Sequence, residues 1–223
     1  MGFDFNYMLS LMPILFGYLG VTLNMALWGL LFSLIIAVFI ALIRVYRIPV
    51  LNQLAQVYIS FFRGTPLLVQ LFLLYYGLPQ VFPIFIGLDA FSAAVIGLSL
   101  HFAAYKAESI RAAINGIDRS QMEASLSIGM TELQAMRRVI LPQATRIALP
   151  SLMNYFIDMI KSTSLAFTLG VAEIMARAQM EASSSFKFFE AFLAVALIYW
   201  VMVILLTRIQ YWAENKLNKA YQR

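Results

Sequence analysis

The sequence has no cysteine and a single histidine, His101, among 223 residues. Without cysteine there is no disulfide framework, thiolate nucleophile or cysteine metal site, and one histidine argues against a histidine-built metal centre. None of the eleven glycines is followed by lysine. The chain therefore lacks the G-x-x-x-x-G-K-[ST] loop that cradles ATP phosphates, and any energy for its work must come from a partner or an ion gradient.

Charge is also scarce, because charged residues make up 12 % of the chain and hydrophobic residues 62 %. Soluble domains average about 25 % charged and about 45–50 % apolar residues. So little charge could not cover a water-soluble fold without large apolar patches, whereas lipid accepts such a surface. The net charge of +5 is spread over loops rather than gathered on one aromatic-rich face, which argues against nucleic-acid binding. The composition indicates an integral membrane protein.

Apolar runs near the length of about 20 residues that crosses a bilayer as a helix predict an all-α fold with five transmembrane helices. We expect them over residues 17–43, 64–88, 91–114, 147–170 and 188–207. Residues 50–63 form either an amphipathic helix at the membrane interface or the first turns of the second span, with a kink at residues 64–66. The first apolar segment has no cleavage signal and should stay in the mature protein.

Basic residues gather on one side of this layout. They comprise Arg44, Arg47, the arginines of residues 115–146 and the tail residues Lys216, Lys219 and Arg223. We also interpret Lys106, late in the third span, as marking the approach to that side. The opposite side has only Arg177 and Lys187. The positive-inside tendency therefore predicts a periplasmic N-terminus and a cytoplasmic C-terminus.

The loop over residues 115–146 is too polar to span and carries helix start and stop signals. Asp118 and Thr131 each precede a glutamine by three residues, which is typical of helix N-caps. We expect one helix over 119–128, ended by a left-handed Gly129, and another over 132–141, ended by Pro142. A short capped helix on the cytoplasmic side suits docking into a groove of another protein, although the loop could also merely link two spans.

The same loop reads Glu123-Ala124-Ser125-Leu126-Ser127-Ile128-Gly129-Met130, followed by Leu141-Pro142-Gln143-Ala144. This pattern resembles the EAA loop of the membrane subunits of binding-protein-dependent ABC importers. Further similarities lie at residues 62–66, at 103–108 with Arg111, and at 161–165. Together they resemble the polar-amino-acid branch of that family, and the sequence as a whole is most similar to the cystine permeases.

The resemblance implies a type I importer permease, with one transmembrane domain over residues 1–223 and a coupling loop at 115–146. It implies ATP-driven import of polar amino acids, cystine or a related one, across a bacterial inner membrane. The implied partners are a second permease copy in a homodimer, a periplasmic amino-acid-binding protein and an ATP-binding cassette subunit. The residues that would contact this last subunit are Glu123, Ala124, Ser125, Gly129 and Met130. ATP would bind the partner, and this chain would have no cofactor, no metal and no catalytic residue.

Ionisable residues in a span are candidate substrate contacts, because a charge at the bilayer centre costs about 2.5–3.5 kcal/mol. Asp158 lies about eleven residues, or roughly 16 Å, into the fourth span. Lys161 follows three residues later, so the two can also form a purely structural pair. The family usually has an acid directly after the matching lysine, where this chain has Ser162, itself a candidate substrate contact. We infer that Asp158 supplies that carboxylate for a substrate ammonium from one turn earlier.

The third span carries His101, Tyr105 and Glu108 on one polar stripe, which should face the bundle interior. His101 is more often a packing residue than a ligand, and Glu108 either pairs with Arg111 or contacts substrate. Gln70 is a weaker candidate. Arg63 has a structural or gating role: it stabilises the kinked backbone, pairs with an acid from another helix, or contacts a substrate carboxylate.

The alternative function is an ion-coupled secondary transporter or channel subunit, with Asp158, Lys161 and His101 as an ion relay. Such a protein would not need the 115–146 loop in this form.

Overall fold

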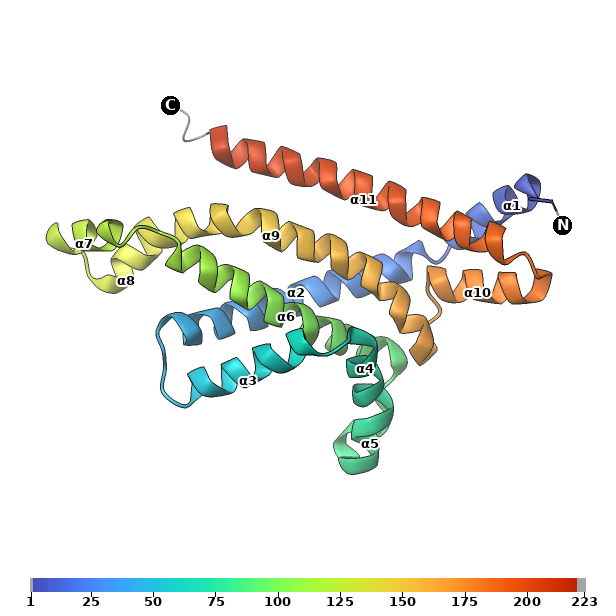
Figure 1. Cartoon of the computed structure of the whole chain (residues 1–223), viewed down its shortest axis with the longest axis horizontal. Helices are drawn as coiled ribbons and strands as arrows, with labels where there is room; N and C mark the ends of the chain where they lie inside the picture. Colours follow the sequence, from blue (N-terminus) through green and yellow to red (C-terminus); the bar gives the residue numbers. More distant parts are fainter. Residues whose placement is uncertain (1, 220–223) are drawn as a thin grey trace. The chain divides into compact units, whose positions relative to one another are not determined.

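The computed structural model describes residues 2–219, and every regular element in that range is helical. The α-helices are α1 (Phe5–Phe16), α2 (Leu19–Val45), α3 (Leu51–Gly64), α4 (Leu67–Phe72), α5 (Leu78–Val81), α6 (Ala90–Asn115), α7 (Arg119–Ser127), α8 (Glu132–Ala135), α9 (Leu141–Ser162), α10 (Ile174–Ser185) and α11 (Phe188–Lys219) (Figure 1). Two π-helical segments, η1 (Leu73–Gly77) and η3 (Met136–Ile140), and two 3-10 segments, η2 (Pro83–Phe85) and η4 (Thr163–Leu169), lie between them. Arg223 of the basic tail lies outside the described residues.

Three of these helices, α2, α6 and α11, are long and apolar enough to cross a membrane, and two more spans result if each of two bent helix pairs counts as one. The all-α membrane fold is therefore confirmed, and α2 and α6 end within two residues of the predicted bounds. The predicted end of the last span at residue 207 was too early for the helix itself. Arginine and lysine are good helix formers, so α11 continues through Arg208.

The second predicted span is not one helix over residues 64–88. Instead α3 ends at Gly64, and α4 begins at Leu67 after Pro66, whose backbone is extended. A proline has no N–H to donate and disfavours the helical conformation in the residue before it, so the helix breaks here. Residues 51–64 therefore form a helix of their own, separate from the one that follows.

The fourth predicted span starts earlier than residue 147, and the prediction that Pro142 ends a helix is wrong. Helix α8, the π-helical segment η3 and α9 follow one another without a gap. In the π turn the Leu141 N–H bonds to the carbonyl of Met136, five residues back. This wider turn lies just before Pro142, where the helix must accommodate a missing N–H and a bulky ring. Asp158 consequently lies four residues before the end of α9.

Contacts divide the chain into two compact units, and the first comprises residues 1–31, 65–99 and 156–208. Its main apolar cluster joins α1, α10 and α11. The buried members are Met8, Leu11, Leu15, Ile174, Ala178, Ala182, Ala191, Ala194, Val195 and Ile198. Half of them are alanine or valine, and small side chains let helices approach closely without large voids.

The second unit comprises residues 32–64, 100–155 and 209–223. One cluster in it packs the end of α6 against η3 and α9 through Ala113, Ile114, Met136, Ile140, Ala144 and Ala148. A smaller cluster of alanines joins α2 and α6 through Ala37, Ala103 and Ala107. Helices α7 and α8 connect α6 to η3, and these clusters pack the elements at both ends of that connection.

In the first unit Asp4 caps α1 and ties it to the segment that precedes α11. Its Oδ1 accepts a hydrogen bond from the Tyr7 N–H at 2.9 Å, and its Oδ2 lies 2.6 Å from Lys187 Nζ. The backbone N–H of Asp4 donates to Oε1 of Glu190 at 2.9 Å. The hydrogen bond from Lys187 lowers the pKa of Asp4, and the same contact raises the pKa of Lys187.

This pair predicts a plateau of stability with pH. Because the pKa of Asp4 is lowered, its contribution is complete above about pH 4 and is lost as the pH falls through the lowered value. Because the pKa of Lys187 is raised, its contribution is complete below about pH 10.4 and is lost as the pH rises through the raised value. We expect Asp4→Asn to flatten the acid limb of the melting temperature, measured by circular dichroism. A Glu132→Gln control, at an exposed acid outside this pair, should leave the acid limb in place, and an unchanged acid limb in Asp4→Asn would contradict the assignment.

Candidate functional site

The loop that resembles the EAA motif folds into a capped helix, α7. The Asp118 side chain accepts a hydrogen bond from the Ser120 N–H at 2.9 Å at its start. At its end Gly129 has φ +84°, and the N–H groups of Gly129 and Met130 bond to the carbonyls of Leu126 and Ser125 at 3.0 and 3.1 Å. This double closure is a Schellman motif, which needs a left-handed residue. The predicted start and stop of the helix are therefore confirmed.

A reciprocal capping box starts the next helix, α8. The Gln134 N–H donates to Thr131 Oγ1 at 3.2 Å, and the Thr131 N–H donates to Gln134 Oε1 at 3.0 Å. Met122 of α7 packs against the apolar cluster that joins α6, η3 and α9. Helix α7 is thus fixed at both ends and on one face.

The remaining face of this segment is open to solvent. Glu123, Ala124 and Gly129 are exposed, whereas Ser125 is buried and donates from Oγ to the Gln121 carbonyl at 2.7 Å. Large apolar side chains are exposed beside the acid, and the exposed fractions of Leu126 and Ile128 are 41 % and 75 %. An acid flanked by exposed apolar groups on a rigid short helix has the chemistry of a protein-docking surface.

The second unit also holds the polar stripe of α6. The rings of His101 and Tyr105 lie 5.1 Å apart, and the Arg63 guanidinium lies 5.4 Å from the Tyr105 ring centroid. The Tyr105 hydroxyl also donates to the Arg63 carbonyl at 3.5 Å. Arg63 thus makes a cation–π contact at the end of α3, and the described ion pairs include none with Arg63.

Glu108 lies one turn further along α6 and forms a two-pronged ion pair with Arg111. Both side chains are about a quarter exposed. This ion pair with Arg111 supports a structural role for Glu108. The carboxylate is already occupied, so any substrate would compete with a bidentate guanidinium partner.

The first unit brings together three of the predicted residues. Lys161 Nζ lies 2.7 Å from Asp158 Oδ1, and the exposed fractions of the two side chains are 53 % and 51 %. The Ser162 hydroxyl donates back to the Asp158 carbonyl at 2.8 Å. Asp158 and Lys161 thus form an accessible pair near the end of α9, while Ser162 serves the helix backbone.

Gln70 belongs to the same unit but is buried and committed to the helix break before α4. Its Nε2 donates to the carbonyl and to Oγ1 of Thr65 at 3.1 and 2.8 Å. These bonds hold the first turn of α4 against the preceding residues. A structural role explains its burial without a ligand.

A family model described as "Binding-protein-dependent transport system inner membrane component" matches residues 29–219. The chain belongs to this family. It is 81 % identical to the probable amino-acid ABC transporter permease protein PatM of Vibrio harveyi, over the full length of both. It is 42 % identical to the L-cystine transport system permease protein TcyL of Bacillus subtilis (strain 168), covering 99 % of this chain and 94 % of that one.

A solved structure described as an amino acid ABC transporter with histidines matches with a TM-score of 0.89 and 36 % identity. The match covers 97 % of this permease and 100 % of that chain. The protein is therefore a multi-pass permease subunit of an amino-acid ABC importer of the inner membrane, as the names of its relatives also indicate. The family as a whole implies an ATP-binding subunit and a substrate-binding protein as partners.

Sequence reasoning missed the position of Lys106 in the permease. We interpreted it as a marker of the basic side, but its side chain is completely buried, with Nζ 2.6 Å from Ser33 Oγ. The described ion pairs include none with Lys106. The available signal was its setting, because Ala103, Ala104 and Ala107 leave room for helix packing around it.

Glu173 was missed altogether. It is completely buried at the start of α10, where its Oε1 accepts the Ala176 N–H at 2.7 Å. The Tyr199 hydroxyl of α11 donates to its Oε2 at 3.4 Å. An acid shortly after Gly170, whose φ is +94°, was the signal for a helix stop followed by a new N-cap.

Proposed function

We propose that this permease works as a homodimer that binds one separate ATPase subunit per protomer through α7. It would receive a polar amino acid from a periplasmic binding protein and release it into the cytoplasm. The observation that carries the proposal is α7 itself: a capped helix with Glu123 exposed beside Leu126 and Ile128. ATP would bind and be hydrolysed in the partner, and the permease would need no cofactor of its own.

The packing around α7 supports a lever mechanism. Helix α7 is joined to α6 on one side and, through the capped α8 and η3, to α9 on the other. When ATP draws the partner subunits together, a pull on α7 would displace these helices as rigid bodies. Rigid helices moved at one end convert a local pull into alternating access.

The proposed topology has a periplasmic N-terminus and a cytoplasmic α7. Arg119, Arg137 and Arg138 are exposed in this segment, and lysine and arginine favour the cytoplasmic side of a membrane. In this orientation the binding protein and the ATPase lie on opposite sides.

The accessible ion pair at the end of α9 supports an amino acid as the substrate. If substrate binding opens this ion pair, the Asp158 carboxylate can bind the ammonium of a zwitterionic amino acid and the Lys161 ammonium can bind its carboxylate. His101 and Glu108 remain further candidates for contact. We propose cystine or a related polar amino acid as the cargo, on the basis of the similarity to the cystine permease.

Purification with the ATPase subunit and reconstitution with the binding protein in vesicles test the proposal. We expect ATP-dependent uptake of labelled cystine, with other polar amino acids compared at equal concentration. Uptake that follows a proton or sodium gradient, with no associated ATPase, would replace the proposal with a secondary transporter.

For the substrate contact we expect Asp158→Asn to reduce uptake by about tenfold, because it removes one charge-assisted contact. The variant keeps the shape of the side chain, and the wild-type pair is half exposed, so folding should be preserved. Asp89→Asn, another carboxylate of the first unit, is the matched control. Unchanged uptake and substrate preference at equal expression would remove Asp158 from the substrate path.

A further inference from the structure

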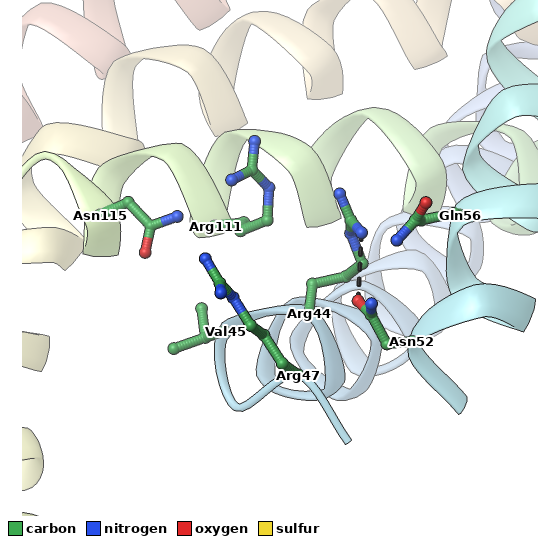
Figure 2. Close-up of a pocket in the computed structure, with 7 residues that line it drawn as sticks. All are labelled: Arg44, Val45, Arg47, Asn52, Gln56, Arg111 and Asn115. Atoms are coloured by element: carbon green, nitrogen blue, oxygen red, sulfur yellow. Dashed lines mark hydrogen bonds between the residues drawn. The ribbon is translucent and has the colours of Figure 1, made fainter. Parts of the chain in front are cut away.

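A polar cavity of about 430 Å³ opens in the second unit at the end of α2. It is lined by Arg44, Val45, Arg47, Asn52, Gln56, Arg111 and Asn115 (Figure 2). These residues come from α2, the following loop, α3 and α6. The Arg47 side chain extends toward the α6 residues Arg111 and Asn115 in this view. The cavity is separate from the exposed face of α7.

The lining carries three guanidinium groups and no carboxylate. Glu108, just outside it, is already engaged by Arg111 in a two-pronged ion pair. One acid therefore faces three bases, and Arg44 and Arg47 have no acidic partner among the described ion pairs. Such an excess of positive charge in one cavity is stabilised by an anion.

Arg44 is also incompletely satisfied by the protein. Its Nη1 donates to Asn52 Oδ1 at 3.1 Å, but its Nε is buried without a hydrogen-bond partner in the described part of the chain. Guanidinium N–H groups are strong donors, and a buried donor left unpaired costs about 1–3 kcal/mol. A ligand with several acceptor oxygens would satisfy it.

The depth of the cavity identifies the kind of anion. Arg44 and Arg47 lie where the apolar span of α2 ends, which is the level of the lipid headgroups. Guanidinium groups bind phosphate oxygens in paired hydrogen bonds, and amide side chains can complete the set. Basic pockets between spanning helices at this level are sites for anionic lipid headgroups.

We propose that this cavity binds the phosphate of an anionic phospholipid headgroup, through Arg44, Arg47 and Arg111. The bound lipid would bridge the end of α2 and α6 within this unit. The assignment of the site to the cytoplasmic leaflet rests on the proposed function, whereas the binding chemistry does not. The inference can therefore fail while the transport assignment stands, and the converse also holds.

Native mass spectrometry of the full-length permease, purified in dodecyl maltoside with the subunits it retains, tests the site. The probes are phosphatidylglycerol, phosphatidylcholine and inorganic phosphate. We expect phosphatidylglycerol to bind more tightly than the net-neutral phosphatidylcholine. We also expect Arg44→Gln or Arg47→Gln to weaken it by about tenfold, because each removes a charge-assisted contact. Arg137→Gln, at an exposed arginine outside the cavity, is the control.

The salt dependence of wild-type binding gives a second readout that needs no variant, and phosphatidylglycerol should dissociate as ionic strength rises. Displacement of phosphatidylglycerol by millimolar inorganic phosphate would identify a free phosphate as the ligand of the same chemistry. Failure of phosphate to compete would identify the lipid. Equal binding of both lipids, or unchanged binding in both cavity variants, would overturn the proposal.

Discussion

Replacing Glu123 by lysine is expected to abolish coupled transport while leaving the fold of the permease intact. The Glu123 side chain is exposed on α7, and its backbone carbonyl, which accepts from Ser127 Oγ at 2.9 Å, is unaffected by the substitution. Exposed substitutions of this kind usually change stability by no more than about 0.5 kcal/mol. At a protein interface, loss of one partner of a buried charge pair costs about 2–5 kcal/mol. We therefore expect at least about a thirtyfold loss of ATPase association.

Two measurements on the same preparation check this expectation. Size-exclusion chromatography with the ATPase subunit reports association, and uptake into vesicles reports coupling. Glu132→Lys makes the same charge change on the neighbouring α8, also at an exposed glutamate. We expect Glu132→Lys to keep much more of the wild-type ATPase association and uptake than Glu123→Lys does. Equal losses in both variants would indicate a general charge effect of the loop, and normal coupling in Glu123→Lys would remove α7 from the ATPase interface.

The parts of the fold that the sequence predicted well depend on local signals. An uncharged run identified α2, and a mainly apolar run identified α6, almost to their ends, because the length of an apolar run follows the membrane thickness. Capping residues located α7 equally well, since Asp118 and Gly129 act on backbone groups a few residues away. Neither kind of signal needs any knowledge of what packs against the helix.

The errors arise where distant segments decide the outcome. Pro142 has the local signature of a helix end, yet η3 and α9 continue through it while Met136, Ile140 and Ala144 are buried in one cluster. Apolar packing on both sides of the proline favours a continuous helix over a break. Helix α10 was not predicted for the same reason, because its buried face packs against α1 and α11. Helix α1 in particular is far away in the sequence.

The candidate site was predicted in the same uneven way. The pairs Asp158 with Lys161 and Glu108 with Arg111 exist, because helical spacing alone brings residues three apart together. The alanines beside Lys106 indicate a packed setting, but its partner Ser33 is far away in sequence and cannot be found from α6 alone.

Replacing the buried Glu173 by alanine is expected to destabilise the permease by about 3 kcal/mol. The substitution removes the N-cap of α10, which is typically worth about 1 kcal/mol. It also removes one acceptor of the partly buried Tyr199 hydroxyl, and a typical hydrogen bond contributes about 0.5–1.5 kcal/mol. The space vacated by the carboxylate adds to the loss, because α1, α10 and α11 share one packed cluster.

Melting followed by circular dichroism measures this effect, since a chain without cysteine offers no site for thiol-reactive dyes. For a chain of this size we expect a fall in Tm of roughly 10 °C in Glu173→Ala. Glu173→Gln keeps an oxygen for the Ala176 N–H and should lose much less. Glu181→Ala removes a carboxylate from the same helix, but its partly exposed pair with Arg177 is worth about 0.5 kcal/mol. A Glu173→Ala variant that melts like Glu181→Ala would show that the buried carboxylate does not hold α10 in place, and that packing against α1 and α11 suffices.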